Sequence, residues 1–136
     1  MFIIKKRFHF SAAHRLCSDA MSEAENFAAF GKCASPNYHG HNYVLDVAVT
    51  GEMNPLTGMV INYDELKRIV NDEIIEALDH KNLNMDVDFL RGEITTSENL
   101  ARLIWERLAP RIKGARLYEI TLGESNDNIA TYRGEV

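Results

Sequence analysis

The chain has 136 residues, of which 46% are hydrophobic, and a formal net charge of −5. This size and composition suffice for one hydrophobic core without disulfides, so we expect a single domain spanning residues 1–136. The chain is acidic and has no basic run longer than Lys5, Lys6 and Arg7, so it lacks the charge pattern typical of nucleic-acid-binding proteins. A small-molecule partner is therefore favoured.

The sequence also lacks export and membrane signals. The apolar start MFII is too short for a signal peptide, and no stretch of 18 apolar residues occurs. The two cysteines, Cys17 and Cys33, do not have the spacing of a disulfide framework, which indicates free thiols in a reducing compartment. We expect a cytoplasmic protein that does not enter a membrane.

A first strand is predicted from residue 4 to residue 14. Its even positions are apolar apart from Lys6, so that parity should face the core. His14 has the same parity as Phe8 and Phe10 and is therefore expected to point inward. His9 has the opposite parity and should face solvent.

The second predicted strand covers residues 39–51 and begins with two histidines. His39 and His41 have the parity of the apolar residues Tyr43, Leu45, Val47 and Val49, so both imidazoles should project from the core face. Cys33 precedes them in the segment GKCASPN, whose composition predicts a loop.

Two further segments flank the second strand. Ser22 and Glu25 have capping-box spacing, which predicts a short helix or ordered loop within residues 18–30. After the turn-forming residues 52–58, we expect a third short extended piece from Met59 to Asn62.

Helical periodicity then appears twice. The first helix should run from Tyr63 to Leu78, with Asn62 and Glu65 as a capping pair, and should end at Asp79 and His80. The second begins at TTSEN, where Thr95 and Glu98 have capping-box spacing, and stops before Pro110.

The C-terminal region predicts two more strands, at residues 118–124 and 129–133. Glu124 continues the apolar face of Tyr118, Ile120 and Leu122, so its carboxylate needs a polar partner. The element order ββααββ predicts an α+β fold: an antiparallel four-stranded sheet with two helices on one face.

Three inward imidazoles suggest a metal site. An open set of three histidines is typical of catalytic zinc, and His14, His39 and His41 supply such a set. A competing interpretation adds Cys33 as a fourth ligand, which makes the site structural. Each of these residues also has an ordinary structural explanation. His14 can be a core histidine and Cys33 a small buried side chain. Asp79 and His80 can be polar residues at a helix end, and Thr95 and Thr96 can be N-caps.

Beyond these patterns, five segments resemble the 6-pyruvoyl-tetrahydropterin synthase family, in its order and spacing across nearly the whole chain. They are FGKCASPNYHGHNY, GMVINYDELK, LDHKNLNMDV, TTSENLARLIWERL and GESNDNIATYRGE. The resemblance implies the tunnelling fold, in which the sheets of neighbouring subunits join into an oligomeric barrel. It further implies a homohexamer, a dimer of trimers, with active sites at subunit interfaces.

The resemblance also assigns roles to residues of this chain. It implies Zn²⁺ bound by His14, His39 and His41, a catalytic thiol at Cys33 assisted by Asp79 and His80, a pterin anchor at Glu124, and Thr95 and Thr96 near the pterin pocket. The implied reaction converts 7,8-dihydroneopterin triphosphate to 6-pyruvoyl-tetrahydropterin and triphosphate. We further hypothesise that the adjacent cations Arg15, Lys32 and Lys81 help to hold the triphosphate.

Two other functions compete with this one. A sister branch of the family uses the same substrate to make 6-carboxytetrahydropterin and acetaldehyde. Its members commonly have three residues between the cysteine and the first histidine of the pair and a Pro-Thr-Ser-Glu run, whereas this chain has five residues and Thr-Thr-Ser-Glu. Both features favour the pyruvoyl enzyme, although Tyr38 stands where that branch usually has a small residue. A non-catalytic zinc or pterin-binding module is disfavoured because the chain has Cys33, Asp79, His80 and Glu124 together, and a module that only binds has no need of the thiol.

Overall fold

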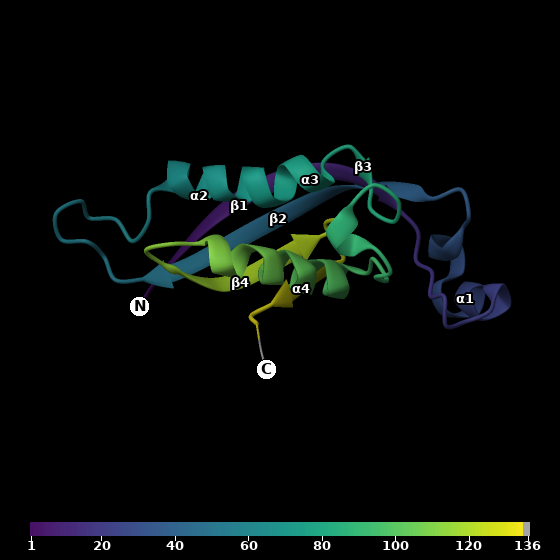
Figure 1. The fold of residues 1–136 in the computed structure, drawn as a ribbon. Coiled ribbons are helices and arrows are strands. Elements are labelled where there is room, and N and C mark those ends of the chain that lie inside the picture. The colour runs from purple at the N-terminus through teal and green to yellow at the C-terminus, as the bar shows by residue number, and fades with distance from the viewer. Residues whose placement is uncertain (135–136) are drawn as a thin grey trace.

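Figure 1 shows the fold in a computed structural model of the chain, which describes residues 1–134. Five strands form one sheet in the order β3-β1-β2-β4-β5. The strands are β1 (Phe2–His14), β2 (His39–Gly51), β3 (Lys81–Asn82), β4 (Arg116–Gly123) and β5 (Ile129–Tyr132). The helices are α1 (Glu23–Phe30), α2 (Tyr63–Val70), α3 (Glu76–Leu78) and α4 (Ser97–Leu108). The predicted α+β class is confirmed.

The long antiparallel pair β1–β2 is the centre of the sheet. Its register runs from Phe2 opposite Gly51 to His14 opposite His39. The predicted second strand is confirmed in its bounds, and the first begins two residues earlier than predicted. Because His14 and His39 form the last pair of this ladder, the two imidazoles are brought together by strand register alone.

The prediction of four strands was wrong in one respect. A fifth strand, β3, pairs with β1 in the parallel direction over Lys81 and Asn82. It is too short to show a hydrophobic alternation, so the sequence gives no sign of it. The extended piece expected at Met59–Asn62 does not join the sheet. There Asn54 N–H donates to the carbonyl of Met59 at 2.9 Å, which closes a local loop.

The helices follow the predicted capping only in part. Ser22 and Glu25 form the expected capping box of α1. Asn62 caps α2 by accepting from Asp64 N–H, but its predicted partner Glu65 instead accepts from Arg68. α2 continues through a π-helical turn (Asn71–Ile75) into α3. The N-cap of α4 is Thr96, whose hydroxyl accepts from Asn99 N–H. The predicted pair of Thr95 and Glu98 was wrong because the hydroxyl of Thr95 instead donates to the carbonyl of Arg15.

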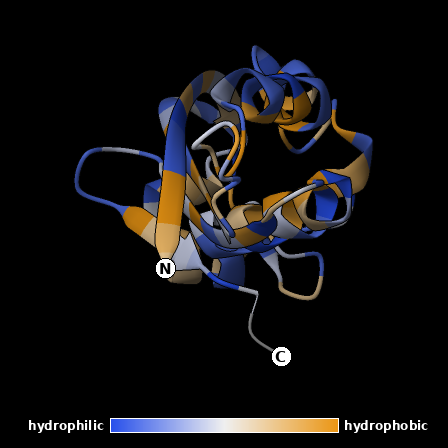
Figure 2. Ribbon diagram, turned by 90° about the vertical axis from the view of Figure 1, so that its left-hand side faces the viewer, coloured by the Kyte–Doolittle hydropathy of each residue, from blue (hydrophilic) through white to orange (hydrophobic). Residues whose placement is uncertain are grey.

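Helices α2, α3 and α4 cover one face of the sheet. α2 and α3 pack on β1, whereas α4 packs on β4 and β5. Figure 2, seen from the end where the chain starts, shows this helical layer beside the strands, with the apolar start of β1 in orange at the N label. The inward parities of the first two strands are confirmed, since Phe8, Phe10, Tyr43 and Leu45 are all buried.

α1 lies beyond the end of the sheet at which β2 begins, away from the other helices (Figure 1). None of the helices in residues 1–134 is both long and apolar enough to cross a bilayer.

Candidate functional site

Three histidines meet at one end of the β1–β2 pair. One ligand nitrogen from each of His14, His39 and His41 lies within 4.8 Å of the others. Ring centroids are 4.6 Å apart for His14 and His39, 5.1 Å for His14 and His41, and 4.9 Å for His39 and His41. All three rings meet at steep angles, so their edges rather than their faces converge. This arrangement suits coordination of one ion by three nitrogens.

His14 is the most enclosed of the three, with 1% of its surface exposed. Its Nδ1 lies 3.0 Å from the carbonyl oxygen of Thr95, which can only accept, so Nδ1 carries the proton. Burial, followed by the neighbouring His39 and His41, lowers the pKa of His14 to about 4. His14 is therefore neutral at physiological pH and leaves Nε2 as its ligand atom.

The other two imidazoles carry an unmet hydrogen-bonding requirement. The Nε2 atoms of His39 and His41 are buried without a hydrogen-bond partner among the described residues. Burial and the nearby His41 also lower the pKa of His39, so it too favours the neutral form that binds metals. Buried nitrogens without partners are costly unless a ligand satisfies them, so the donor set fits a metal ion.

Glu124 lies beside this cluster. Its Oε2 is 3.9 Å from Nε2 of His41, and it accepts a hydrogen bond from the hydroxyl of Ser97 at 3.3 Å. The side chain is about one quarter exposed, so one carboxylate is held at the rim of the cluster and remains accessible to a ligand. Burial, and secondarily the charge of Glu124, raise the pKa of the neighbouring Tyr43.

Cys33 lies in a 3₁₀ turn, η1 (Gly31–Ala34), before β2. The turn is fixed to the residues that follow His14: Leu16 N–H donates to the carbonyl of Cys33 at 2.8 Å, and the Arg15 guanidinium donates to the carbonyl of Ala34 at 2.9 Å. The thiol is free and partly exposed. The chain thus brings the turn bearing Cys33 next to the strand end that bears His14.

Asp79 and His80 form a separate pair at the edge of the sheet. The Nδ1 of His80 lies 2.9 Å from Asp79 Oδ2, while Asp79 Oδ1 accepts from Ser11 N–H at 2.9 Å. The Ser11 hydrogen bond, and secondarily His80, lower the pKa of Asp79. The carboxylate is therefore ionised and orients an imidazole whose side chain is 82% exposed.

The backbone of His80 is unusual as well. Its φ of 62° lies in the left-handed region, as does that of Tyr38 at 65°, the residue before His39. Such conformations are strained for residues other than glycine and concentrate at functional sites.

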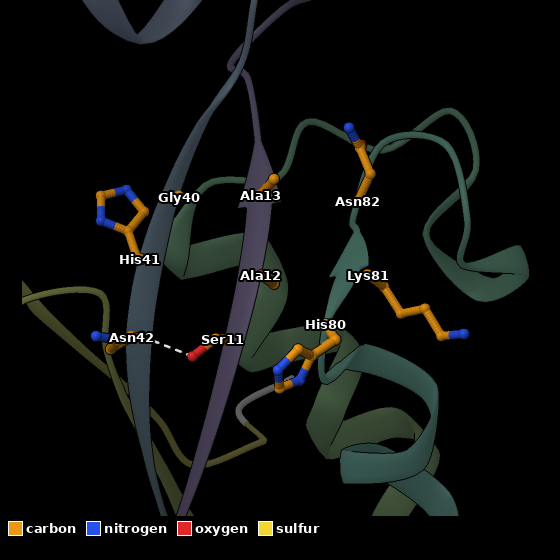
Figure 3. Close-up of a pocket in the computed structure, with 9 residues that line it drawn as sticks. All are labelled: Ser11, Ala12, Ala13, Gly40, His41, Asn42, His80, Lys81 and Asn82. Carbon is orange, nitrogen blue, oxygen red and sulfur yellow. Dashed lines mark hydrogen bonds between the residues drawn. The ribbon is translucent and has the colours of Figure 1, made fainter.

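A cavity of about 480 Å³ is lined by His41 of the histidine cluster and by His80. Figure 3 shows its lining, with His41 and His80 on either side of the β1–β2 pair and a hydrogen bond between Ser11 and Asn42. Within residues 1–134, no hydrogen bond or ion pair joins Cys33 to Asp79 or His80. One chain therefore assembles the three histidines with Glu124, and presents the Asp79–His80 pair separately.

Three consecutive hydroxyl residues, Thr95, Thr96 and Ser97, lie at the start of α4. Thr95 is buried behind His14, and Thr96 caps α4. The residue that contacts Glu124 is Ser97, which the sequence analysis did not select. The sequence marks Ser97 only as the third of three consecutive hydroxyl residues. Its contact with Glu124 joins residues 27 positions apart and depends on the fold.

The three predicted cations also differ in position. Arg15 is partly buried and lines a second cavity of about 430 Å³, together with the acidic residues Asp19 and Glu93. Lys32 is exposed, and Figure 3 shows Lys81 extending away from the strand pair. These positions do not converge on the histidine cluster, so their role in holding a triphosphate stays a prediction.

Comparison with known proteins adds an independent observation. A family model described as 6-pyruvoyl tetrahydropterin synthase matches residues 3–135. A Pongo abelii protein named 6-pyruvoyl tetrahydrobiopterin synthase is 46% identical over 132 residues, which cover 97% of this chain and 91% of the relative. The solved structure of Caenorhabditis elegans 6-pyruvoyl tetrahydropterin synthase superposes with a TM-score of 0.94 at 41% identity, covering 98% of this chain and 96% of that one.

A more distant relative carries the name of the sister activity. An Archaeoglobus fulgidus protein named putative 6-carboxy-5,6,7,8-tetrahydropterin synthase is 34% identical over 116 residues, which cover 85% of this chain and 91% of the relative. The higher identity therefore lies with the proteins named for the pyruvoyl product. The family match over nearly the whole chain, together with the close structural agreement, confirms the resemblance seen in the sequence: the chain belongs to the 6-pyruvoyl tetrahydropterin synthase family.

Proposed function

We propose that this protein is a zinc-dependent lyase that converts 7,8-dihydroneopterin triphosphate to 6-pyruvoyl-tetrahydropterin with release of triphosphate. The observation that carries the proposal is the convergence of His14, His39 and His41 beside Glu124, in a chain of this family. An open metal site next to a carboxylate anchor suits a small polar heterocycle with an oxygen-bearing side chain. We propose residues 1–136 as one domain of this type.

The three histidines would hold the ion through neutral imidazoles, with His14 oriented by Thr95. When bound, Zn²⁺ supplies Lewis acidity that polarises oxygens of the substrate side chain. The donor set supports an open site because Cys33 is not among the ligand atoms that lie together, and the resemblance to the family implies a catalytic role for its thiol. The interpretation of Cys33 as a fourth, structural ligand is therefore disfavoured.

Proton movement falls to Cys33, Asp79 and His80. The thiolate of Cys33 removes a proton from the substrate side chain and returns one to it, as a general base and acid. The Asp79 carboxylate accepts from His80 Nδ1, so Nε2 of His80 is left to exchange protons. The exposure of His80 supports transfer to a group outside its own chain.

Glu124 is proposed as the pterin anchor. Its carboxylate accepts the N–H donors of the pterin ring, a charge-assisted contact that also offsets the cost of its partial burial. Ser97 holds one oxygen of that carboxylate and so fixes its orientation. Thr95 accepts a hydrogen bond from His14, and Thr96 caps α4. We therefore propose that both residues shape the wall of the pterin pocket.

A complete site requires a second copy of the chain. The separation of Cys33 from the Asp79–His80 pair supports active sites at subunit interfaces in a homohexamer built as a dimer of trimers. The outer side of β5 has no strand partner within the described residues, and an unpaired edge of this kind favours association into a barrel. We place the enzyme in the cytoplasm, consistent with its free thiols.

The direct test is release of triphosphate from 7,8-dihydroneopterin triphosphate by the zinc-loaded protein. Cys33→Ala should retain zinc and bind the pterin but lose activity by about 100-fold or more, the usual contribution of acid–base catalysis. Cys17→Ala is the matched control and should keep parental activity. Equal activity of Cys33→Ala and the parent would remove the thiol from the mechanism, whereas no release by the parent would refute the proposed function.

A further inference from the structure

Asn84 lies where the chain leaves the sheet after β3. The segment before it runs along the end of β1: His80 N–H donates to the carbonyl of Ser11 at 2.6 Å, and Leu83 N–H donates to the carbonyl of Ala13 at 2.8 Å. Figure 3 shows this parallel arrangement of β3 beside β1. The hydrogen bonds between this segment and β1 therefore continue along β1 toward His14.

The backbone of this segment turns away before the ladder reaches Arg15. Met85 and Asp86 both donate their N–H groups to the carbonyl of Asn82, at 3.2 and 2.9 Å. The side-chain amide of Asn84 takes over the pairing. Its Oδ1 accepts from Arg15 N–H at 2.9 Å, and its Nδ2 donates to the carbonyl of Arg15 at 3.1 Å. One amide thus replaces the donor and the acceptor that a strand residue would supply.

This pairing fixes the residues on both sides of His14. Ala13 is held by Leu83 and Arg15 by Asn84, and the Arg15 carbonyl also accepts from the hydroxyl of Thr95 at 3.3 Å. Side chains on a strand alternate between faces, so the orientation of the backbone at residues 13 and 15 determines where His14 points. A change at Arg15 is thereby transmitted to the imidazole.

We propose that Asn84 is a positioning residue of the metal site, acting on His14 through the main chain of Arg15. The inference rests on the proposed zinc site. Partners outside the ligand shell typically contribute about 10- to 100-fold to metal affinity, and Asn84 acts at the lower end because it does not touch the ring. Asn84→Leu, which keeps a similar size and removes both hydrogen bonds, should weaken Zn²⁺ binding about tenfold.

The chain offers a matched control in Asn26. Its amide makes the same two contacts with the main chain of Ser18, accepting from N–H at 2.8 Å and donating to the carbonyl at 3.0 Å. Asn26→Leu removes these two hydrogen bonds, together with those that the amide donates to the carbonyls of Met21 and Ser22, and none of them involves a cluster histidine or its chain neighbours. A general loss of stability should affect both variants, whereas a loss of metal-site geometry should affect only Asn84→Leu.

The experiment measures Zn²⁺ affinity of the full chain by competition with a chromogenic chelator, and the visible spectrum of the Co²⁺ form. The proposal predicts about tenfold weaker Zn²⁺ binding and an altered Co²⁺ spectrum for Asn84→Leu, with parental values for Asn26→Leu. Affinity of Asn84→Leu within about twofold of the parent, or equal weakening in both variants, overturns it.

A milder variant covers the case in which Asn84→Leu does not fold. Asn84→Asp keeps the acceptor for Arg15 N–H and replaces the donor with an oxygen that repels the Arg15 carbonyl, so it should weaken Zn²⁺ binding and alter the Co²⁺ spectrum as well. Parental values for this variant overturn the proposal. A parent protein that binds no Zn²⁺ would instead refute the zinc dependence proposed above, so the two failures are distinguishable.

Discussion

The Nδ1 of His14 donates a hydrogen bond to the main-chain oxygen of Thr95 at 3.0 Å, across 81 positions of sequence. This contact joins the end of β1 to the residue just before the N-cap of α4. It assigns the proton of a buried imidazole to Nδ1 and leaves Nε2 available as the ligand atom, in a cluster with His39 and His41. The stability and metal affinity of the site depend on this neutral form.

The metal-free protein should lose stability on acidification. His14 has a pKa of about 4 in the fold, lowered mainly by burial, against about 6.5 when unfolded. Between these values the unfolded chain binds more protons, so the contribution is complete above pH 6.5 and is lost as the pH falls toward 4, by about 3 kcal/mol in total.

Urea unfolding of the metal-free protein at pH 7 and pH 5 measures this effect. His14→Gln should unfold with a shallower dependence on pH than the parent, and His9→Gln, at an exposed position of β1, should keep the parental dependence. If the free energy of unfolding changes with pH equally in the parent and in His14→Gln, His14 is not held neutral in the fold.

Removal of any one cluster histidine should abolish stoichiometric zinc binding. His41→Ala leaves two imidazoles, which is too few for a stable site of this type. The measurement is zinc content after dialysis, by atomic absorption, with His9→Ala as the control. Full zinc retention by His41→Ala would contradict the three-histidine site.

Glu124 and Ser97 should affect substrate binding to different degrees. Glu124→Gln removes a charged acceptor and should lower kcat/KM about 10- to 100-fold, whereas Ser97→Ala removes a neutral donor and should lower it about 2- to 10-fold. Glu119→Gln, a carboxylate on β4 that pairs with Arg133 at 2.9 Å, is the matched control. A larger loss from Ser97→Ala than from Glu124→Gln would reverse the proposed order of contact with the pterin.

Mixed oligomers should reveal shared active sites. Cys33→Ala and His80→Ala should each be inactive alone. If each site takes Cys33 from one subunit and His80 from another, co-assembly of the two variants should restore roughly a quarter of parental activity, because random mixing gives about that fraction of intact sites. The assay is activity after co-expression, and no recovery above either variant alone would place both residues in the same subunit's site.

The sequence was most informative where hydrophobic alternation was long. The parity of β1 and β2 predicted the inward direction of His14, His39 and His41 because thirteen paired residues give a one-sided pattern with little ambiguity. The inward carboxylate of Glu124 followed from the same reasoning on the strand that leads to it.

The sequence was least informative where several residues satisfy the same local rule. Thr95, Thr96 and Ser97 are all good N-caps, and only the tertiary contacts of Thr95 with Arg15 and His14 select Thr96 as the cap. The strand β3 has two residues and no pattern, so its pairing with β1 is fixed by main-chain hydrogen bonds that leave no trace in residue type. The same holds for the side-chain amide of Asn84 acting as a strand residue.

Product analysis of the zinc-loaded protein with 7,8-dihydroneopterin triphosphate is the most direct test of the proposed activity. We predict triphosphate and 6-pyruvoyl-tetrahydropterin in equal amounts, without acetaldehyde, identified by chromatography and mass spectrometry. Acetaldehyde with 6-carboxytetrahydropterin would contradict the pyruvoyl assignment and move the protein to the sister activity, and the absence of both pterin products would contradict the lyase function itself.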